Sequence, residues 1–129
     1  MDRKKKNIEI LLKSSERDWD TLKSMYECKR YYAALFFGQL VLEKLLKAVY
    51  IEKNNESAPF IHDLKKIAKK SGLDLDKKRE EELDIISGFN INARYDDYKD
   101  EFYKKATKRY TENYIEIIKE TRQWLKKQI

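Results

Sequence analysis

Hydrophobic residues recur every three or four positions in two long stretches of the chain, which predicts two long helices. In residues 7–28 one face carries Ile8, Leu11, Leu12, Ser15, Trp19, Leu22 and Tyr26, and the other face is charged. Residues 2–6 are expected to be frayed, and Lys29-Arg30 marks a short connection. The next stretch, about Tyr31 to Lys53, is apolar nearly all round, so it is expected at the centre of a bundle, covered by neighbouring helices or a second subunit.

One narrow polar line interrupts this central helix. Gln39, Glu43 and Lys47 repeat every four residues, with Lys44 beside them. The simplest interpretation is an i,i+4 ion pair between Glu43 and Lys47 on a strip that faces solvent or an interface. Alternatively, the strip lines a polar cleft, for which a dimer interface is one option. Charges at mid-span also argue against a transmembrane helix.

The second half of the chain predicts shorter elements and one long closing helix. Residues 54–60 read as a loop that holds the only proline, and a short helix from about Asp63 stops at Gly72. A fourth segment, about 75–87, is interrupted at 88–92, and residues 93–103 read as an ordered loop or a single turn. The last helix is expected over about 104–127. These elements predict an all-α, up-and-down bundle of four to five helices in a single domain, residues 1–129.

Composition narrows the chemistry. A chain of 129 residues fits one compact domain, and three Gly with one Pro are too few for a turn-rich β fold. A lone Cys28 excludes an internal disulfide framework and a cysteine zinc site, and a lone His62 excludes a multi-histidine metal centre within one chain. Neither a metal nor a cofactor is therefore expected. The free thiol and the lack of a secretory signal indicate a reducing cytoplasm.

The charge balance permits contact with phosphates without demanding it. There are 29 Lys and Arg against 23 Asp and Glu, a net charge of +6. Residues 99–129 hold nine basic and five acidic side chains, and the last third of the chain is rich in tyrosine. Basic side chains interleaved with aromatic ones suit single-stranded RNA. Tyr110 and Tyr114 fall on the apolar face of the last helix, so these two are expected to pack in the core.

Four motifs, taken together, resemble the HEPN family of small helical bundles, named for nucleotide binding in prokaryotes and higher eukaryotes. They are an amphipathic first helix around Trp19, the pattern Gln-x-x-x-Glu-Lys-x-x-Lys-Ala at 39–48, Pro59-x-x-His62-Asp63-Leu64, and Asn92-Ala-Arg-Tyr95. The resemblance covers nearly the whole chain. It implies a homodimer, often encoded beside a minimal nucleotidyltransferase as a toxin–antitoxin pair. Many members are metal-independent ribonucleases with an Arg-x(4–6)-His motif, in which Arg holds a phosphate and His serves in acid–base chemistry.

This chain departs from that motif, because no histidine follows Arg94 within eight residues. It also departs from the subgroup that carries Ala-Arg-Tyr: that subgroup commonly has proline after the tyrosine, and here the residue is Asp96. The resemblance therefore assigns Arg94 to the site without its catalytic partner. Arg94 and His62 are the candidate catalytic residues, and Arg94, Tyr95, Tyr98 and Lys47 are the candidate nucleotide- or RNA-binding residues. In the competing interpretation, Arg94 pairs with Asp96, Asp97 or Asp100, and His62 anchors the start of a helix.

Three functions remain open at this point. The favoured one is a homodimer that binds a nucleotide or RNA and works with a minimal nucleotidyltransferase, in a toxin–antitoxin or defence-type module. The second is a metal-independent endoribonuclease that uses Arg94 with His62 or a tyrosine as proton carrier. The third is a helical interaction scaffold, which predicts no ligand binding.

Overall fold

The computed structural model describes residues 2–129, and all regular elements in that range are α-helices. In chain order they are α1 (Arg3–Glu27), α2 (Tyr31–Asn54), α3 (Leu64–Lys70), α4 (Lys77–Arg94), α5 (Asp96–Lys105) and α6 (Lys108–Lys126). The all-α class is thus confirmed, with six helices in the described range where four to five were expected. None of these helices is long and apolar enough to cross a bilayer.

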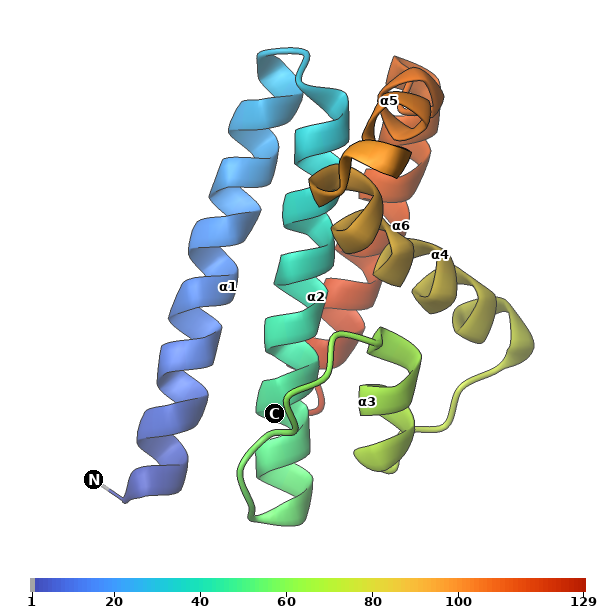
Figure 1. Ribbon diagram of the computed structural model, residues 1–129. Helices are drawn as coiled ribbons and strands as arrows, with labels where there is room; N and C mark the ends of the chain where they lie inside the picture. Colours follow the sequence, from blue (N-terminus) through green and yellow to red (C-terminus); the bar gives the residue numbers. More distant parts are fainter. Residues whose placement is uncertain (1) are drawn as a thin grey trace.

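Helix α2 is the centre of the bundle, as its all-round apolar character predicts. α1 runs antiparallel to it on one side and α6 packs on the other, while α4 crosses obliquely and α3 lies beside its C-terminal half (Figure 1). Half of the residues of α2 are buried, including Leu35, Val41, Leu42 and Leu46. The other helices therefore take their positions from the surface of α2.

Gly38 lets three helices approach one another closely. A Cβ at this position would lie 2.5 Å from Cδ1 of Ile118 on α6 and 3.3 Å from Cδ1 of Leu22 on α1. Both neighbours are fully buried. The bare backbone of Gly38 therefore provides the space into which these side chains pack.

The chain turns from α1 into α2 through Lys29 and Arg30, as predicted. Lys29 adopts the left-handed conformation, with φ of 61°, and the two amides of the turn donate to Tyr26 O and Met25 O. The preceding Cys28 caps α1 and leaves its thiol exposed. At the other end of α1, Asp2 accepts a hydrogen bond from the Lys5 amide. The expected fraying of residues 2–6 is therefore wrong, because this side-chain cap starts the helix at Arg3.

Helix α3 agrees with the sequence prediction at both ends. The carboxylate of Asp63 accepts a hydrogen bond from the Lys66 amide, which caps the first turn. Gly72 follows the helix with φ of 78°, a conformation that glycine adopts without strain. The preceding loop begins at Asn55, which is also left-handed.

The interruption expected at residues 88–92 does not occur, because α4 continues from Lys77 to Arg94. Phe89 and Asn90 are 1% and 5% exposed, so this segment is packed into the core. Burial of one face carries the helix through Gly88, which alone costs only about 1 kcal/mol relative to alanine.

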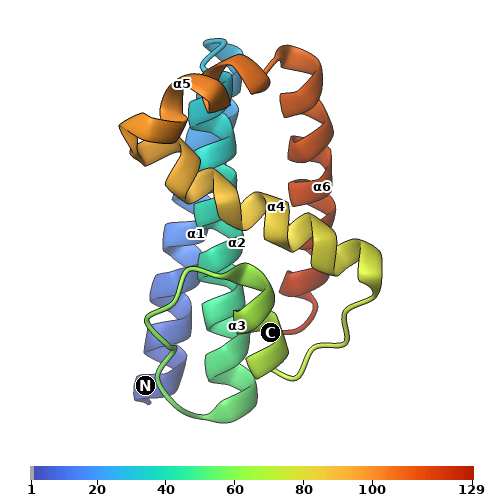
Figure 2. The same cartoon turned by 45° about the vertical axis from the view of Figure 1, so that its right-hand side comes forward.

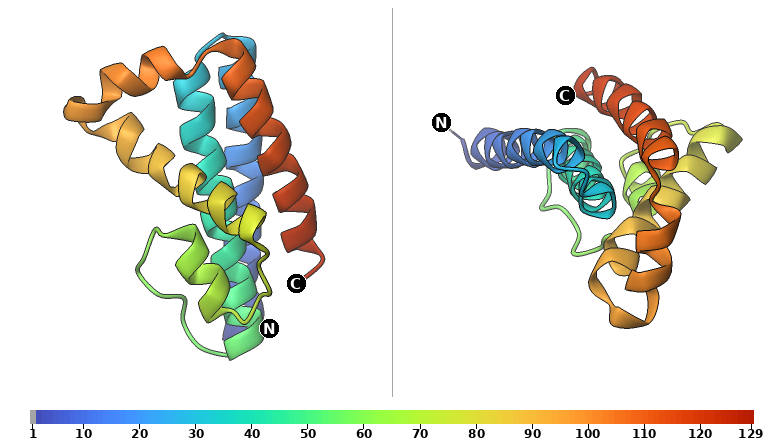
Figure 3. Two further views of the ribbon diagram at one scale, coloured as in Figure 1. Left: turned by 90° about the vertical axis from the view of Figure 1, so that its right-hand side faces the viewer. Right: turned by 90° about the horizontal axis from the view of Figure 1, so that it is seen from above.

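The loop expected at 93–103 is also wrong, because most of it is α5. Acidic residues in the first turn and lysines in the last turn complement the helix dipole. Phe102 anchors α5 by stacking on Phe89, with ring centroids 5.4 Å apart. The α4–α5 corner projects from the side of the bundle, as the left view of Figure 3 shows. The last helix then starts at Lys108 rather than 104, because Thr107 caps it by accepting from the Tyr110 amide.

Candidate functional site

A buried carboxylate, Glu43 on α2, is the centre of a polar network. It accepts hydrogen bonds from Gln39 Nε2 at 2.8 Å and Lys47 Nζ at 3.0 Å, and His62 Nδ1 lies 3.0 Å from Oε1 and 3.1 Å from Oε2. The predicted pair of Glu43 and Lys47 is confirmed. The strip does not face solvent, however, since Gln39 is 0% and Glu43 7% exposed. It faces the 55–63 loop and α4 of the same chain.

The hydrogen bonds decide the charge state of Glu43. Burial by itself raises the pKa of the carboxyl, but the bonds from Gln39, Lys47 and His62 outweigh burial and lower the pKa below its usual value of 4.5. Glu43 is therefore ionised at neutral pH. An ionised buried carboxylate needs these partners, because an unpaired one would carry a large desolvation cost.

His62 lies at the rim of the network, where the 55–63 loop enters α3. Asp63 rather than His62 caps that helix, so the imidazole is free to contact Glu43. With Nδ1–H donating to the carboxylate, Nε2 is the ring nitrogen left for an outside partner. The His62 side chain is 66% exposed. A carboxylate that orients an accessible imidazole is an arrangement that serves acid–base chemistry.

Asn90 connects this network to α4, and sequence reasoning missed it. Its Nδ2 donates to Gln39 Oε1 at 2.9 Å, and the residue is 5% exposed. The signal was a polar residue one turn before Arg94, but it was hidden because residues 88–92 were interpreted as a loop. Since residues four apart share a helix face, Arg94 follows Asn90 along the same side of α4.

Arg94 ends α4 at the projecting corner. Its guanidinium lies 5.5 Å from the centre of the Tyr95 ring, and within residues 2–129 it forms no ion pair. The competing interpretation, a pair with one of three nearby aspartates, is thus not what the structure contains. Tyr95 and Tyr98 are 54% and 52% exposed. An unpaired guanidinium beside one accessible ring, with a second exposed tyrosine on the first turn of α5, is suited to a phosphate and a base.

The candidate residues thus form two groups. Arg94, Tyr95 and Tyr98 gather at the α4–α5 corner, whereas Lys47 and His62 meet at Glu43. In the part of the chain that the structure describes, no hydrogen bond or ion pair joins His62 to Arg94. The Asn90–Gln39–Glu43 chain of hydrogen bonds extends from the second group to α4 and ends at Asn90, one turn before Arg94. The Lys47 side chain is 16% exposed and its ammonium is bound to Glu43, which neutralises its charge.

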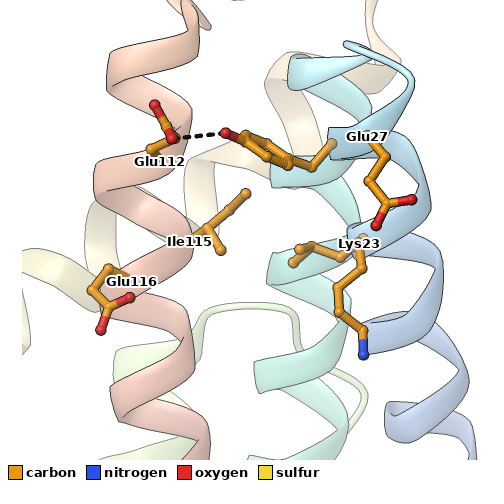
Figure 4. Close-up of a pocket in the computed structure, with 7 residues that line it drawn as sticks. Lys23, Glu27, Glu112, Ile115 and Glu116 are labelled. Carbon is orange, nitrogen blue, oxygen red and sulfur yellow. Dashed lines mark hydrogen bonds between the residues drawn. The ribbon is translucent and has the colours of Figure 1, made fainter.

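A separate groove of about 370 Å³ lies between α1 and α6 (Figure 4). Its floor is apolar, but Glu27, Glu112 and Glu116 line it with Lys23 as the only cation. Tyr26 donates to Glu112 at 2.7 Å, and this hydrogen bond raises the pKa of Tyr26 to about 12. An anionic groove repels phosphate, so this groove is not a candidate site for binding a nucleotide or RNA.

A family model described as HEPN domain matches residues 8–128, nearly the whole chain. No curated protein and no solved structure matches this chain significantly.

Proposed function

Because the chain belongs to the HEPN domain family, whose functions concern nucleotides and RNA, we propose that it binds a nucleotide or single-stranded RNA at the α4–α5 corner. In this proposal it acts as a homodimer together with a minimal nucleotidyltransferase, in a toxin–antitoxin or defence-type module. The observation that carries the binding role is the exposed guanidinium of Arg94, which has no carboxylate partner within residues 2–129. Lys47 is left out of the binding set because Glu43 holds its ammonium.

The homodimer is supported by apolar side chains that this chain alone leaves uncovered. Phe60 is fully exposed on the 55–63 loop, and Ile91 is 50% exposed on α4, one turn before the corner. A second copy would bury such side chains and bring two Arg94 residues toward one groove. Light scattering after gel filtration should give twice the 15.6 kDa of one chain. A co-expressed minimal nucleotidyltransferase should elute with it.

Replacing Arg94 with alanine should weaken binding of a labelled single-stranded U12 RNA by about tenfold, as expected for loss of a charged hydrogen bond to phosphate. Fluorescence anisotropy measures this affinity. Arg17→Ala is the matched control, because Arg17 is an exposed arginine on α1 without an ion pair. It should bind as the wild type does. Equal affinities for Arg94→Ala and Arg17→Ala, or no binding by the wild type, would exclude the corner as the site.

The Glu43–His62 contact favours one second candidate, a metal-independent endoribonuclease. Nδ1 of His62 is held at 3.0 Å from the carboxylate, which leaves Nε2 as a proton acceptor. For catalysis, His62 of one subunit would have to meet Arg94 of the other or of its own chain. Purified protein incubated with single-stranded RNA in chelator should then cleave it, and both His62→Gln and Arg94→Ala should lower the rate by at least about a hundredfold. RNA that stays intact with the wild type removes this candidate and leaves the binding role.

A further inference from the structure

Two hollows adjoin at the end of the bundle near the α1–α2 turn. Figure 2 shows α5 crossing close to this turn. The Tyr32 and Tyr103 rings form their shared wall, with centroids 5.7 Å apart and planes inclined at 60°. Tyr103 is 63% exposed, so one face of its ring is accessible. Arg94 lines neither hollow.

The first hollow, of about 310 Å³, is cationic. Lys29 enters it from the α1–α2 turn and Lys104 from the last turn of α5, and no acidic side chain lines it. Lys29 forms no ion pair among residues 2–129, and Lys104 has only an exposed contact of 3.4 Å with Asp100. Such an exposed pair contributes little, so both ammonium groups are available to an anion. We call this site the Lys29–Lys104 hollow.

Neighbouring charges restrict where an anion can lie. The second hollow, of about 350 Å³, has Arg30 and Lys99 but also Asp96 and Asp100, so its charges balance. The α1–α6 groove, which Tyr26 also lines, carries three glutamates. A polyanion that reaches the Lys29–Lys104 hollow is therefore repelled from the α1–α6 groove, while the balanced charges of the second hollow do not repel it.

We propose that the Lys29–Lys104 hollow binds one nucleotide unit of single-stranded RNA, with its phosphate on the two lysines and its base on Tyr103. This inference rests on the proposed function and extends it. A single strand is required because a base must be unstacked to reach a tyrosine ring. Cations combined with an accessible aromatic ring are the two components that sequence-tolerant single-strand sites use.

Helix α5 connects this hollow to Arg94. It starts directly after Tyr95 and ends at Lys105, ten residues that span about 15 Å. One short strand can therefore contact the corner and the hollow together. A free nucleotide can occupy only the corner or the hollow, whereas U12 can occupy both. The free nucleotide should therefore bind at least about tenfold more weakly than U12.

The test uses the full chain and labelled U12 RNA. Lys29→Ala/Lys104→Ala should weaken binding by about tenfold and flatten the slope of log affinity against log salt by about 0.7, the value for one phosphate of a single strand that is no longer neutralised. The matched control is Lys13→Ala/Lys119→Ala, two exposed lysines without ion pairs. Tyr103→Ala should also lose about tenfold, whereas Tyr103→Phe should retain binding because the ring remains.

Each outcome decides the inference. If the wild type binds U12 and Arg94→Ala weakens it, but Lys29→Ala/Lys104→Ala equals its control, the hollow is excluded and the corner stands. If the wild type does not bind U12, the proposed function and the hollow both fail. Uridine monophosphate that binds as tightly as U12 overturns the path along α5. Every variant should have a thermal unfolding midpoint within about 4 °C of the wild type, which ensures that folded proteins are compared.

Discussion

Replacing Phe89 with alanine is expected to lower the free energy of unfolding by about 3–5 kcal/mol, the range for removing a buried aromatic ring. Phe89 is 1% exposed, and its ring stacks on Phe102 and meets Tyr110 and Tyr114 edge-on. The cavity left by alanine would remove the support of α5 as well as of α4 and α6. Urea unfolding followed by circular dichroism measures the change.

The chain supplies a control in Ile10 on α1, a large apolar side chain that is 56% exposed. Ile10→Ala shortens this side chain without making a cavity in the core, so its unfolding free energy should stay within about 0.5 kcal/mol of the wild type. A loss below about 1 kcal/mol for Phe89→Ala would contradict the described core, since even modest core truncations exceed that value.

Replacing Glu43 with glutamine is expected to cost about 2–3 kcal/mol at neutral pH, because it leaves Lys47 and His62 without their anion. The loss is smaller than for a fully buried pair, since water reaches both partners. Urea unfolding again measures it. Glu120→Gln, on the exposed side of α6, is the matched control and should change stability by less than about 0.5 kcal/mol.

The same variant tests the charge state of Glu43. Because folding lowers the pKa of Glu43, its contribution is fully present above the usual value of 4.5 and is lost as the pH falls through the folded-state pKa. The stability difference between wild type and Glu43→Gln should therefore shrink between about pH 5 and about pH 2. A difference that is constant or grows over this window would show that Gln39, Lys47 and His62 do not stabilise the charged form of the carboxylate.

The periodic parts of the fold could be predicted because their signals are local. The apolar run of α2, the Asp63 cap and the Gly72 stop each act within a few residues, and each is confirmed. Helix α5 could not be predicted, because its only buried anchor is Phe102 and the ring that holds it is Phe89 on another helix. Tertiary packing of this kind leaves no period in the sequence.

The candidate site follows the same division. The Glu43–Lys47 pair is an i,i+4 contact, which the sequence predicts directly. The contact of His62 with Glu43 joins residues 19 apart, and that of Asn90 with Gln39 joins residues 51 apart. Only the folded chain brings these groups together. Likewise, Lys29 and Lys104 carried no motif, because the hollow forms where the α1–α2 turn meets α5.

The exposed thiol of Cys28 gives this protein a built-in attachment point for a reporter. It is the only cysteine in the sequence, and it immediately precedes Lys29. A maleimide dye would therefore label every molecule at a single position, without mutagenesis. Fluorescence quenching or energy transfer from that dye would track a strand arriving at the turn in real time, separately from events at Arg94.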